Sequence, residues 1–238
     1  QANKVIWSFD FALGDPNSTQ HLAVFSTGEG MYAKAMDFSG KATGTLIPIE
    51  NGAGNGNIAI AFGQDSFLIT YSKVDQAAKK IYRLARFLKL AQPGNAKPYT
   101  LSAAIVIAQI EGTGKRSVGS AAYVAAKDHF LMSWASNGNS YVSYILRDAN
   151  QIAGKIEKLT ETTDSCALIG PRIAVIGLDA MVVGWRDSTN ETCRGTSGIW
   201  MRSVDAASGL ARGKMNYVTY AGGFHTAPDI SASANGFL

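Results

Sequence analysis

The chain has 238 residues, of which 46% are apolar and 17% charged, and its formal net charge is +4. This length and apolar content allow a sizeable hydrophobic core and exclude a disordered chain. The basic excess is too weak and too dispersed to favour a nucleic-acid partner, and there is no run of about 18 apolar residues that would form a transmembrane segment.

The N-terminal part begins at Gln1 without an initiator Met or a signal-peptide pattern, which favours a mature secreted form or a chain seen from an internal residue. Two glycosylation sequons, at Asn17 and Asn190, lie in loop-like stretches. Cys166 and Cys193 also stand in turn-rich polar contexts. They either form a disulfide between two loops or are exposed thiols. Together these features favour a secreted, extracellular glycoprotein with a disulfide.

A repeat of about 50 residues organises the chain. Each copy has an apolar strand, a short turn and a second apolar strand that ends on an aromatic residue, at 61–71, 124–134 and 175–185, with a weaker copy at 20–25. In the three strong copies an aromatic residue follows an aspartate by six positions: Tyr71 after Asp65, Trp134 after Asp128, and Trp185 after Asp179. Because an aspartate side chain can bond backbone groups two residues on, we expect these aspartates to stabilise the turns.

The strands of each copy differ in polarity in a fixed order. The second strand is apolar on both faces, as at 67–69 and 181–183, which predicts a position between two sheets. A third strand carries aromatic and basic residues, and a fourth is more polar. For the basic stretch 79–89 we expect a strand with a solvated edge, with an amphipathic helix or a heparin-type patch as alternatives. Four strands whose polarity rises outward are typical of a β-propeller blade.

This pattern resembles the β-propeller repeat proteins, more loosely the secreted ones, over nearly the whole chain. It lacks the Gly-His and Trp-Asp signature of WD40 blades, the double glycine of kelch blades and the Asp-rich calcium loops of integrin-type blades, so no subfamily follows. The resemblance implies an all-β, propeller-like array of four-stranded antiparallel blades, and no function comes with it. The expected blades are 1–50, 57–105, 118–160 and 171–220, with 228–238 opening a further blade.

The repeat pattern stops at Leu238, inside the second strand of that further blade. Four blades and part of a fifth do not close a ring comfortably. Three explanations stay open. The sequence is part of a longer polypeptide, another protein chain or copy completes or extends the sheet, or the final segment pairs with the first blade.

Residues suited to a metal or catalytic site are few. The histidines His21, His129 and His225 show no ligand spacing, and the first two stand at similar repeat positions, which favours a structural role. The stretch 112–117 lacks the spacing of a phosphate-binding loop. A glycosidase needs two carboxylates across a cleft. Nothing in the sequence indicates that any two of the loop acids Asp75, Glu111 and Glu191 lie opposite each other in this way. We therefore expect no metal and no cofactor.

The candidate binding residues are aromatic and basic residues of the third strands: Tyr82, Arg83, Tyr144, Arg147, Trp200 and Arg202. Aromatic rings stack on sugars and arginines bind acidic groups, although such side chains also fill the space between blades. The sequence favours a non-enzymatic extracellular structural, adhesion or assembly protein whose propeller surfaces contact other proteins. The alternatives are a lectin-like glycan-binding module and a propeller glycosidase or other hydrolase.

Overall fold

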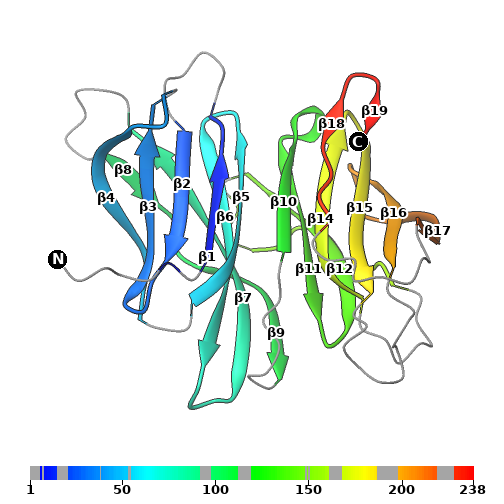
Figure 1. Ribbon diagram of the computed structural model, residues 1–238, viewed down its shortest axis with the longest axis horizontal. Coiled ribbons are helices and arrows are strands. Elements are labelled where there is room, and N and C mark those ends of the chain that lie inside the picture. The colour runs from blue at the N-terminus through cyan, green and yellow to red at the C-terminus, as the bar shows by residue number, and fades with distance from the viewer. Residues whose placement is uncertain are drawn as a thin grey trace. The chain divides into compact units, whose positions relative to one another are not determined.

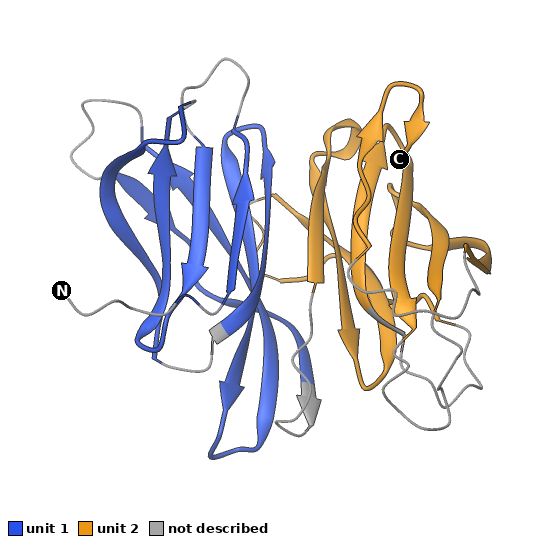
Figure 2. Cartoon of the chain, viewed as in Figure 1, with its two compact units in different colours: residues 1–116 blue, residues 117–238 orange. Residues whose placement is uncertain are grey.

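The computed structural model describes residues 6, 8–14, 21–37, 39–52, 55–91, 98–111, 119–147, 149, 151–160, 168–186, 198–218 and 228–238. Across these residues the chain is all-β, apart from a 3-10 turn at Ala125–Lys127 (Figure 1). It divides into two compact units, residues 1–116 and 117–238 (Figure 2). No helix in this described part is both long and apolar enough to cross a membrane.

Unit 1 contains two antiparallel sheets, here called blades 1 and 2, whose strands are paired in chain order, except that the fifth strand of blade 2 pairs with its third strand. Blade 1 consists of β1 (Ser8–Ala12), β2 (His21–Ser26), β3 (Gly30–Met36) and β4 (Ala42–Asn51). Blade 2 consists of β5 (Asn55–Gly63), β6 (Ser66–Asp75), β7 (Lys80–Leu90), β8 (Tyr99–Leu101) and β9 (Ile105–Glu111).

The strand expected at 79–89 is confirmed as β7, but its expected solvated edge is wrong. The strands β8 and β9 pair with opposite ends of β7 and together take the fourth position of blade 2. Both edges of β7 are therefore occupied, because β6 pairs along its other side.

Unit 2 contains blades 3 and 4, again antiparallel and paired in chain order. Blade 3 consists of β10 (Gly119–Val124), β11 (His129–Ser136), β12 (Asn139–Leu146) and β13 (Glu157–Lys158). Blade 4 consists of β14 (Leu168–Ile176), β15 (Asp179–Arg186), β16 (Ile199–Asp205) and β17 (Ala211–Tyr217). A short hairpin of β18 (Ala232–Ser233) and β19 (Gly236–Phe237) completes the described strands.

Polarity rises from the second strand outward, as the sequence predicts. The side chains of Leu68, Ile69 and Leu131 in the second strands β6 and β11 are fully buried, whereas most residues of the outer strands β4 and β17 are exposed or half-exposed. A second strand is covered on both faces, and its continuous apolar run follows from that position. The expected all-β array of four-stranded antiparallel blades is confirmed.

The third strong repeat is shifted by one residue from the alignment that its aspartate indicates. Ser66 pairs with Gly63 across a two-residue turn, and Asp179 pairs with Ile176 in the same way. Asp179 is therefore the first residue of a strand and corresponds to Ser66, while Asp65 lies in the turn itself. The spacing of six between aspartate and aromatic residue does not place Trp185 in the position of Tyr71.

The position of Tyr71 is occupied in blade 4 by Gly184. A Cβ atom on Gly184 would lie 2.6 Å from the indole of Trp200, the residue that pairs with Gly184 across the sheet. Trp200 is completely buried. The indole from the neighbouring strand thus fills the space that the ring of Tyr71 fills in blade 2.

Each unit has a core between its two blades. In unit 1, Leu22 and Val24 of blade 1 belong to one cluster with Phe67, Ile69 and Tyr71 of blade 2. In unit 2, the cluster combines Val124, Leu131, Val142 and Leu159 of blade 3 with Ile173, Val182, Trp200 and Val204 of blade 4. Burial of these side chains is the main stabilising contribution to sheet-on-sheet packing.

Candidate functional site

The first strands of blades 2 and 4 carry the same irregularity near the end where they begin, here called the leading end of a blade. In β5 the pairing shifts by one residue between Gly56 and Ala59, and in β14 it shifts between Ile169 and Arg172. Each bulge contains a residue with positive φ: Asn57 at 52° and Gly170 at 65°. Bulges at such places re-aim the following side chains and are common beside binding sites.

Side chains of blade 1 meet the β5 bulge in unit 1. The backbone N–H of Ile58 donates to the hydroxyl of Ser8 at 3.3 Å, and the N–H of Ile60 donates to Oδ2 of Asp10 at 3.0 Å. Oδ1 of Asp10 accepts the N–H of Phe11 at 2.9 Å.

Unit 2 repeats this bridge with a neutral residue. Ser120 in β10 corresponds to Asp10 in β1. Each stands two residues before the alanine that pairs with a core leucine of the second strand, Ala12 with Leu22 and Ala122 with Leu131. The hydroxyl of Ser120 accepts the N–H of Ile173 at 3.3 Å. Arg172, directly after the β14 bulge, donates to the carbonyl of Gly119 at 3.0 Å. The first strands thus hold Asp10 in the middle of β1 in unit 1, and Arg172 directly after the bulge of β14 in unit 2.

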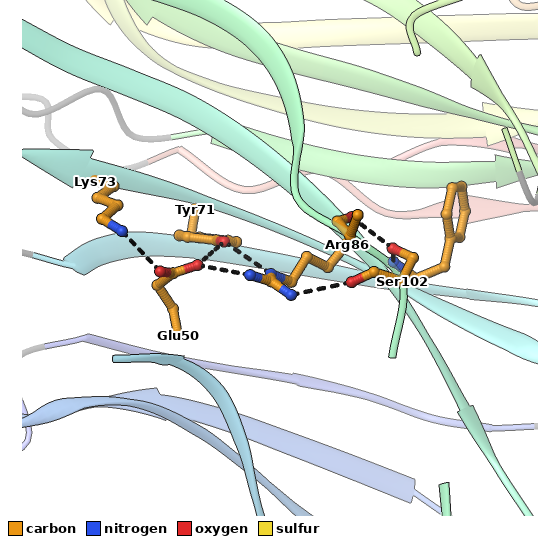
Figure 3. A network of polar contacts seen from close by, with 7 residues as sticks. Glu50, Tyr71, Lys73, Arg86 and Ser102 are labelled. Carbon is orange, nitrogen blue, oxygen red and sulfur yellow. Dashed lines mark hydrogen bonds and ion pairs between the residues drawn. The ribbon is translucent and has the colours of Figure 1, made fainter. Parts of the chain in front are cut away.

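A second polar cluster surrounds Glu50 at the end of β4 (Figure 3). Its Oε1 accepts from Lys73 at 2.7 Å, and its Oε2 accepts from the hydroxyl of Tyr71 at 2.7 Å and from Arg86 at 3.0 Å. Arg86 also donates to the hydroxyl of Tyr71 at 3.2 Å and to the carbonyl of Ser102, between β8 and β9, at 3.0 Å. The cluster thus connects the outer strand of blade 1 to β6 and β7 of blade 2, and to the segment between β8 and β9.

The electrostatics of the cluster keep Glu50 ionised. Burial raises the pKa of Glu50, but the hydrogen bonds from Lys73, Tyr71 and Arg86 outweigh it, and the pKa lies below its ordinary value. Burial, together with the Glu50 carboxylate, raises the pKa of Tyr71. A low pKa is unsuited to a general acid, and both oxygens of Glu50 are already engaged. The geometry supports a structural tie between the blades.

Arg83 and Tyr82 lie side by side in β7, but only the arginine is fully buried. The exposed fraction of Arg83 is 1%, and its guanidinium donates to the carbonyl of Asn57 at 2.6 Å and to the hydroxyl of Thr70 at 2.8 Å. Tyr82 is half-buried and packs against the unit 1 core. Arg83 therefore supports the β5 bulge from within blade 2.

Tyr144 and Arg147 have different roles within blade 3. The ring of Tyr144 stacks on His129 with centroids 4.7 Å apart and covers Gly154, where a Cβ atom would lie 2.3 Å from the ring. Arg147 binds both oxygens of Asp128, at 2.8 and 2.9 Å. The tyrosine thus packs inside unit 2, while the arginine holds a turn.

Trp200 and Arg202 belong to β16 and face blade 3. Arg202 donates to the carbonyl of Leu159 at 2.6 Å and to that of Gly213 at 3.0 Å. The indole Nε1 of Trp200 is buried and has no hydrogen-bond partner within the described residues. The structure brings Tyr144 and Trp200 to the unit 2 core, and places Arg147 at the turn beside Asp128.

Each of the three repeat aspartates has a basic partner on a later strand or at its end. Asp65 pairs with Lys89 at 3.2 Å, Asp128 with Arg147, and Asp179 with Arg212 at 2.5 Å. Arg147, with the hydroxyl of Tyr123, lowers the pKa of Asp128 to about 2. Local bonds from an aspartate side chain to backbone N–H groups are present at three other aspartates: Asp37, Asp75 and Asp205.

The histidines that the structure describes serve the scaffold. His129 is buried, and its Nε2 donates to the carbonyl of Ala206 at 2.7 Å. Burial lowers the pKa of His129. The Nδ1 of His21 accepts the N–H of Gly14 at 3.2 Å. Within the described ranges no group of three His, Cys, Asp or Glu residues could hold a metal ion.

Several predicted features lie outside the described residues. These are the sequons at Asn17 and Asn190, the cysteines Cys166 and Cys193, and also His225, Glu191 and the stretch 112–117.

Sequence reasoning missed Asp10 and Glu50. Asp10 stands between Phe9 and Phe11 in a short strand without a motif, and Glu50 follows an apolar run at the end of an outer strand. The one available signal was charge: Asp10 is the only acidic residue in the described parts of the four first strands β1, β5, β10 and β14.

Comparisons with solved structures find a common fold. The α-L-arabinanase of Penicillium chrysogenum, solved with arabinobiose, is 11% identical with a TM-score of 0.64, and the match covers 99% of this chain and 75% of that one. The GH43 protein BlXynB of Bacillus licheniformis is 13% identical with a TM-score of 0.55, and the match covers 98% of this chain. The sialidase of Trypanosoma rangeli is 12% identical with a TM-score of 0.56 over 90% of this chain.

At these identities the likeness shows the fold alone, which is that of a β-propeller. This chain spans 47% of the length of the Bacillus licheniformis protein and 38% of that of the sialidase. The sequence matches no protein-family model and no curated protein. The expected propeller fold is therefore confirmed, and no family is assigned.

Proposed function

We propose that this protein is a carbohydrate-active β-propeller that binds pentose-containing oligosaccharides and hydrolyses their glycosidic bonds at the first strands of unit 1, around Asp10. The observation that carries this proposal is the match to an arabinanase over 99% of the chain. An exo-1,5-α-L-arabinanase from a bovine ruminal metagenome and an α-L-arabinofuranosidase from Lactobacillus brevis also match, with TM-scores of 0.54. The adhesion and assembly functions that the sequence favoured find no support in these comparisons.

Asp10 is the residue that the proposal places at the reaction. It is half-buried on β1, and the N–H of Ile60 holds its Oδ2 in place. A glycosidase acts through two carboxyl groups, one as general acid and one as base or nucleophile. Backbone donors hold both oxygens of the Asp10 carboxyl group in place, and the proposal assigns this group the role of base or nucleophile. The proposal requires a second carboxyl group, which substitution of the remaining acids would identify.

The test combines hydrolysis with binding. Release of reducing sugar from arabino- and xylo-oligosaccharides is measured for the wild type and for Asp10→Asn, and the affinity is measured by calorimetry. We expect hydrolysis by the wild type, a loss of at least a hundred-fold in Asp10→Asn, and retained binding in both. Absence of hydrolysis together with absence of binding would reject the proposal.

A second candidate is glycan binding without hydrolysis. It is favoured by the single acidic residue found in the described parts of the first strands, because a binding module needs no pair of carboxylates. Binding by a wild type that releases no sugar would support this candidate. An extracellular location belongs to both candidates as a proposal, and peptide mapping at Asn17 and Asn190 for attached glycans tests it.

A further inference from the structure

Blade 1 presents a row of aromatic residues on the side that faces away from the unit 1 core. Phe9 pairs with Phe25 across β1 and β2, and Phe25 pairs with Tyr32 across β2 and β3. Phe9 and Phe11 are 70% and 43% exposed, and the rings of Phe25 and Tyr32 lie 6.1 Å apart. We call Phe9, Phe11, Phe25 and Tyr32 the blade-1 aromatic face. Exposed apolar patches of this kind mark interaction surfaces.

The packing of unit 1 shows which kind of surface covers such a face. Leu22 and Val24 point from one side of blade 1 and pack on Phe67, Ile69 and Tyr71 of blade 2. Those residues of blade 2 lie on the side that corresponds to the blade-1 aromatic face, since side chains alternate along a strand and Leu22 and Phe25 point to opposite sides. The surface best suited to cover the blade-1 aromatic face is therefore the side of another sheet that corresponds to the Leu22 and Val24 side of blade 1.

Blade 4 offers that side. Met181, Val183 and Trp185 alternate with the core residue Val182 and so lie on the side away from blade 3, and Met201 pairs with Val183 on the same side. Met181, Trp185 and Met201 are half-exposed. We call these four residues the blade-4 methionine face. Methionine side chains adapt to an irregular aromatic partner and make favourable contacts with rings.

A sheet fits the blade-1 aromatic face better than a sugar does. A sugar site combines rings with several polar groups that bind hydroxyls. Lys34 pairs with Ala23 and lies on the same side of the sheet as the blade-1 aromatic face. Its ammonium group already donates to the carbonyl of Gly44 at 2.6 Å. The corresponding residues of blade 2 are covered by a sheet. The chemistry of the face is thus that of an interface between blades.

We propose that the blade-1 aromatic face of one copy of this protein binds the blade-4 methionine face of a second copy. The contact joins two different surfaces and is heterologous, so each copy keeps one free face after dimerisation and the assembly extends or closes into a ring. This proposal does not depend on the proposed carbohydrate activity.

Sedimentation velocity over a wide range of protein concentration tests the proposal. We expect the wild type to associate as concentration rises. The pair Phe9→Ser and Phe11→Ser, and separately the pair Met181→Ser and Met201→Ser, should each give a monomer. The matched control, Val106→Ser with Leu146→Ser, removes two apolar side chains that are 56% and 47% exposed elsewhere and should associate like the wild type. Circular dichroism verifies that every variant is folded.

Mixing the two monomeric variants gives the sharpest result. One variant keeps the methionine face and the other keeps the aromatic face, so the mixture should form a one-to-one dimer that goes no further. A wild type that stays monomeric at every concentration would overturn the proposal, and so would association that survives the Phe9→Ser and Phe11→Ser changes. A mixture that stays monomeric would also overturn it, because the two faces that the variants retain would then not bind each other.

Discussion

Oδ2 of Asp10 accepts the backbone N–H of Ile60 at 3.0 Å, and this bond joins the first strands of two separate sheets. No ladder of backbone hydrogen bonds connects β1 with β5 in the sheet pairing of the described residues. In unit 2 the hydroxyl of Ser120 does the same for Ile173. A side chain on one blade thus satisfies a backbone donor of the next, and the identity of these residues affects blade packing directly.

Replacing Asp10 with alanine should lower the free energy of unfolding by about 1–3 kcal/mol, because the N–H of Ile60 loses its acceptor. Asp10→Asn keeps a carbonyl oxygen in place and should cost less. Urea unfolding monitored by tryptophan fluorescence measures both variants. Equal losses in the two variants would mean that the charge, and not the hydrogen bond, is what unit 1 requires.

Gly184→Ala should destabilise the protein by about 1–3 kcal/mol, because the added methyl group meets the indole of Trp200 in a packed core. The combined variant with Trp200→Leu should be more stable than the sum of the two single changes predicts, since the smaller side chain leaves room for the methyl group. Denaturant unfolding of the four proteins in this cycle measures the coupling. Strictly additive losses would contradict the proposed filling of this site by Trp200.

Glu50→Gln should remove a pH-dependent part of the stability. The pKa of Glu50 lies below its ordinary value in the folded protein, so its contribution is present above the ordinary value of about 4.3 and is lost as pH falls through the lower folded value. The wild type should therefore lose its advantage over Glu50→Gln as pH decreases through this range. Unfolding free energies measured at a series of pH values give the difference, and a difference that grows on acidification would contradict the network of Figure 3.

Asp128 should also contribute a pH-dependent part of the folding stability, which is lost in acid. Arg147 lowers the pKa of Asp128 to about 2 from an ordinary value of 3.8, so the stabilisation is complete above the ordinary value and disappears as pH falls toward the folded value. NMR titration of the Asp128 carboxyl carbon measures the pKa directly. In Arg147→Gln the pKa should move back toward 3.8, whereas an unchanged value would assign the shift to Tyr123.

The sequence was sufficient for the blade pattern because burial on both faces leaves a continuous apolar run in each second strand, as around Leu68 and Leu131. It was insufficient for the register of blade 4. Asp179 stands one residue later than Asp65 relative to the turn, and a spacing of residue types does not reveal a shift of one residue. The substitution of Trp200 for the ring of Tyr71 depends on the neighbouring strand, which a linear pattern does not contain.

The candidate site was less predictable than the fold. Arg83 reads as a surface residue of a basic stretch, yet the carbonyl of Asn57, exposed by a bulge, and the hydroxyl of Thr70 give its guanidinium buried partners. Asp10 gains its place from the N–H of Ile60, which is distant in the sequence. Such partners come from the packing of one blade on the next, and residue types alone do not determine it.

The most direct test of the carbohydrate function is an NMR titration of the backbone amides with an arabino-oligosaccharide. The account predicts saturable shifts in the first strands of unit 1, centred on Phe11 and on Ile58 to Ile60, and their loss on Asp10→Ala. Absence of shifts with arabino-, xylo- and sialo-oligosaccharides, or shifts confined to residues remote from the first strands, would contradict it.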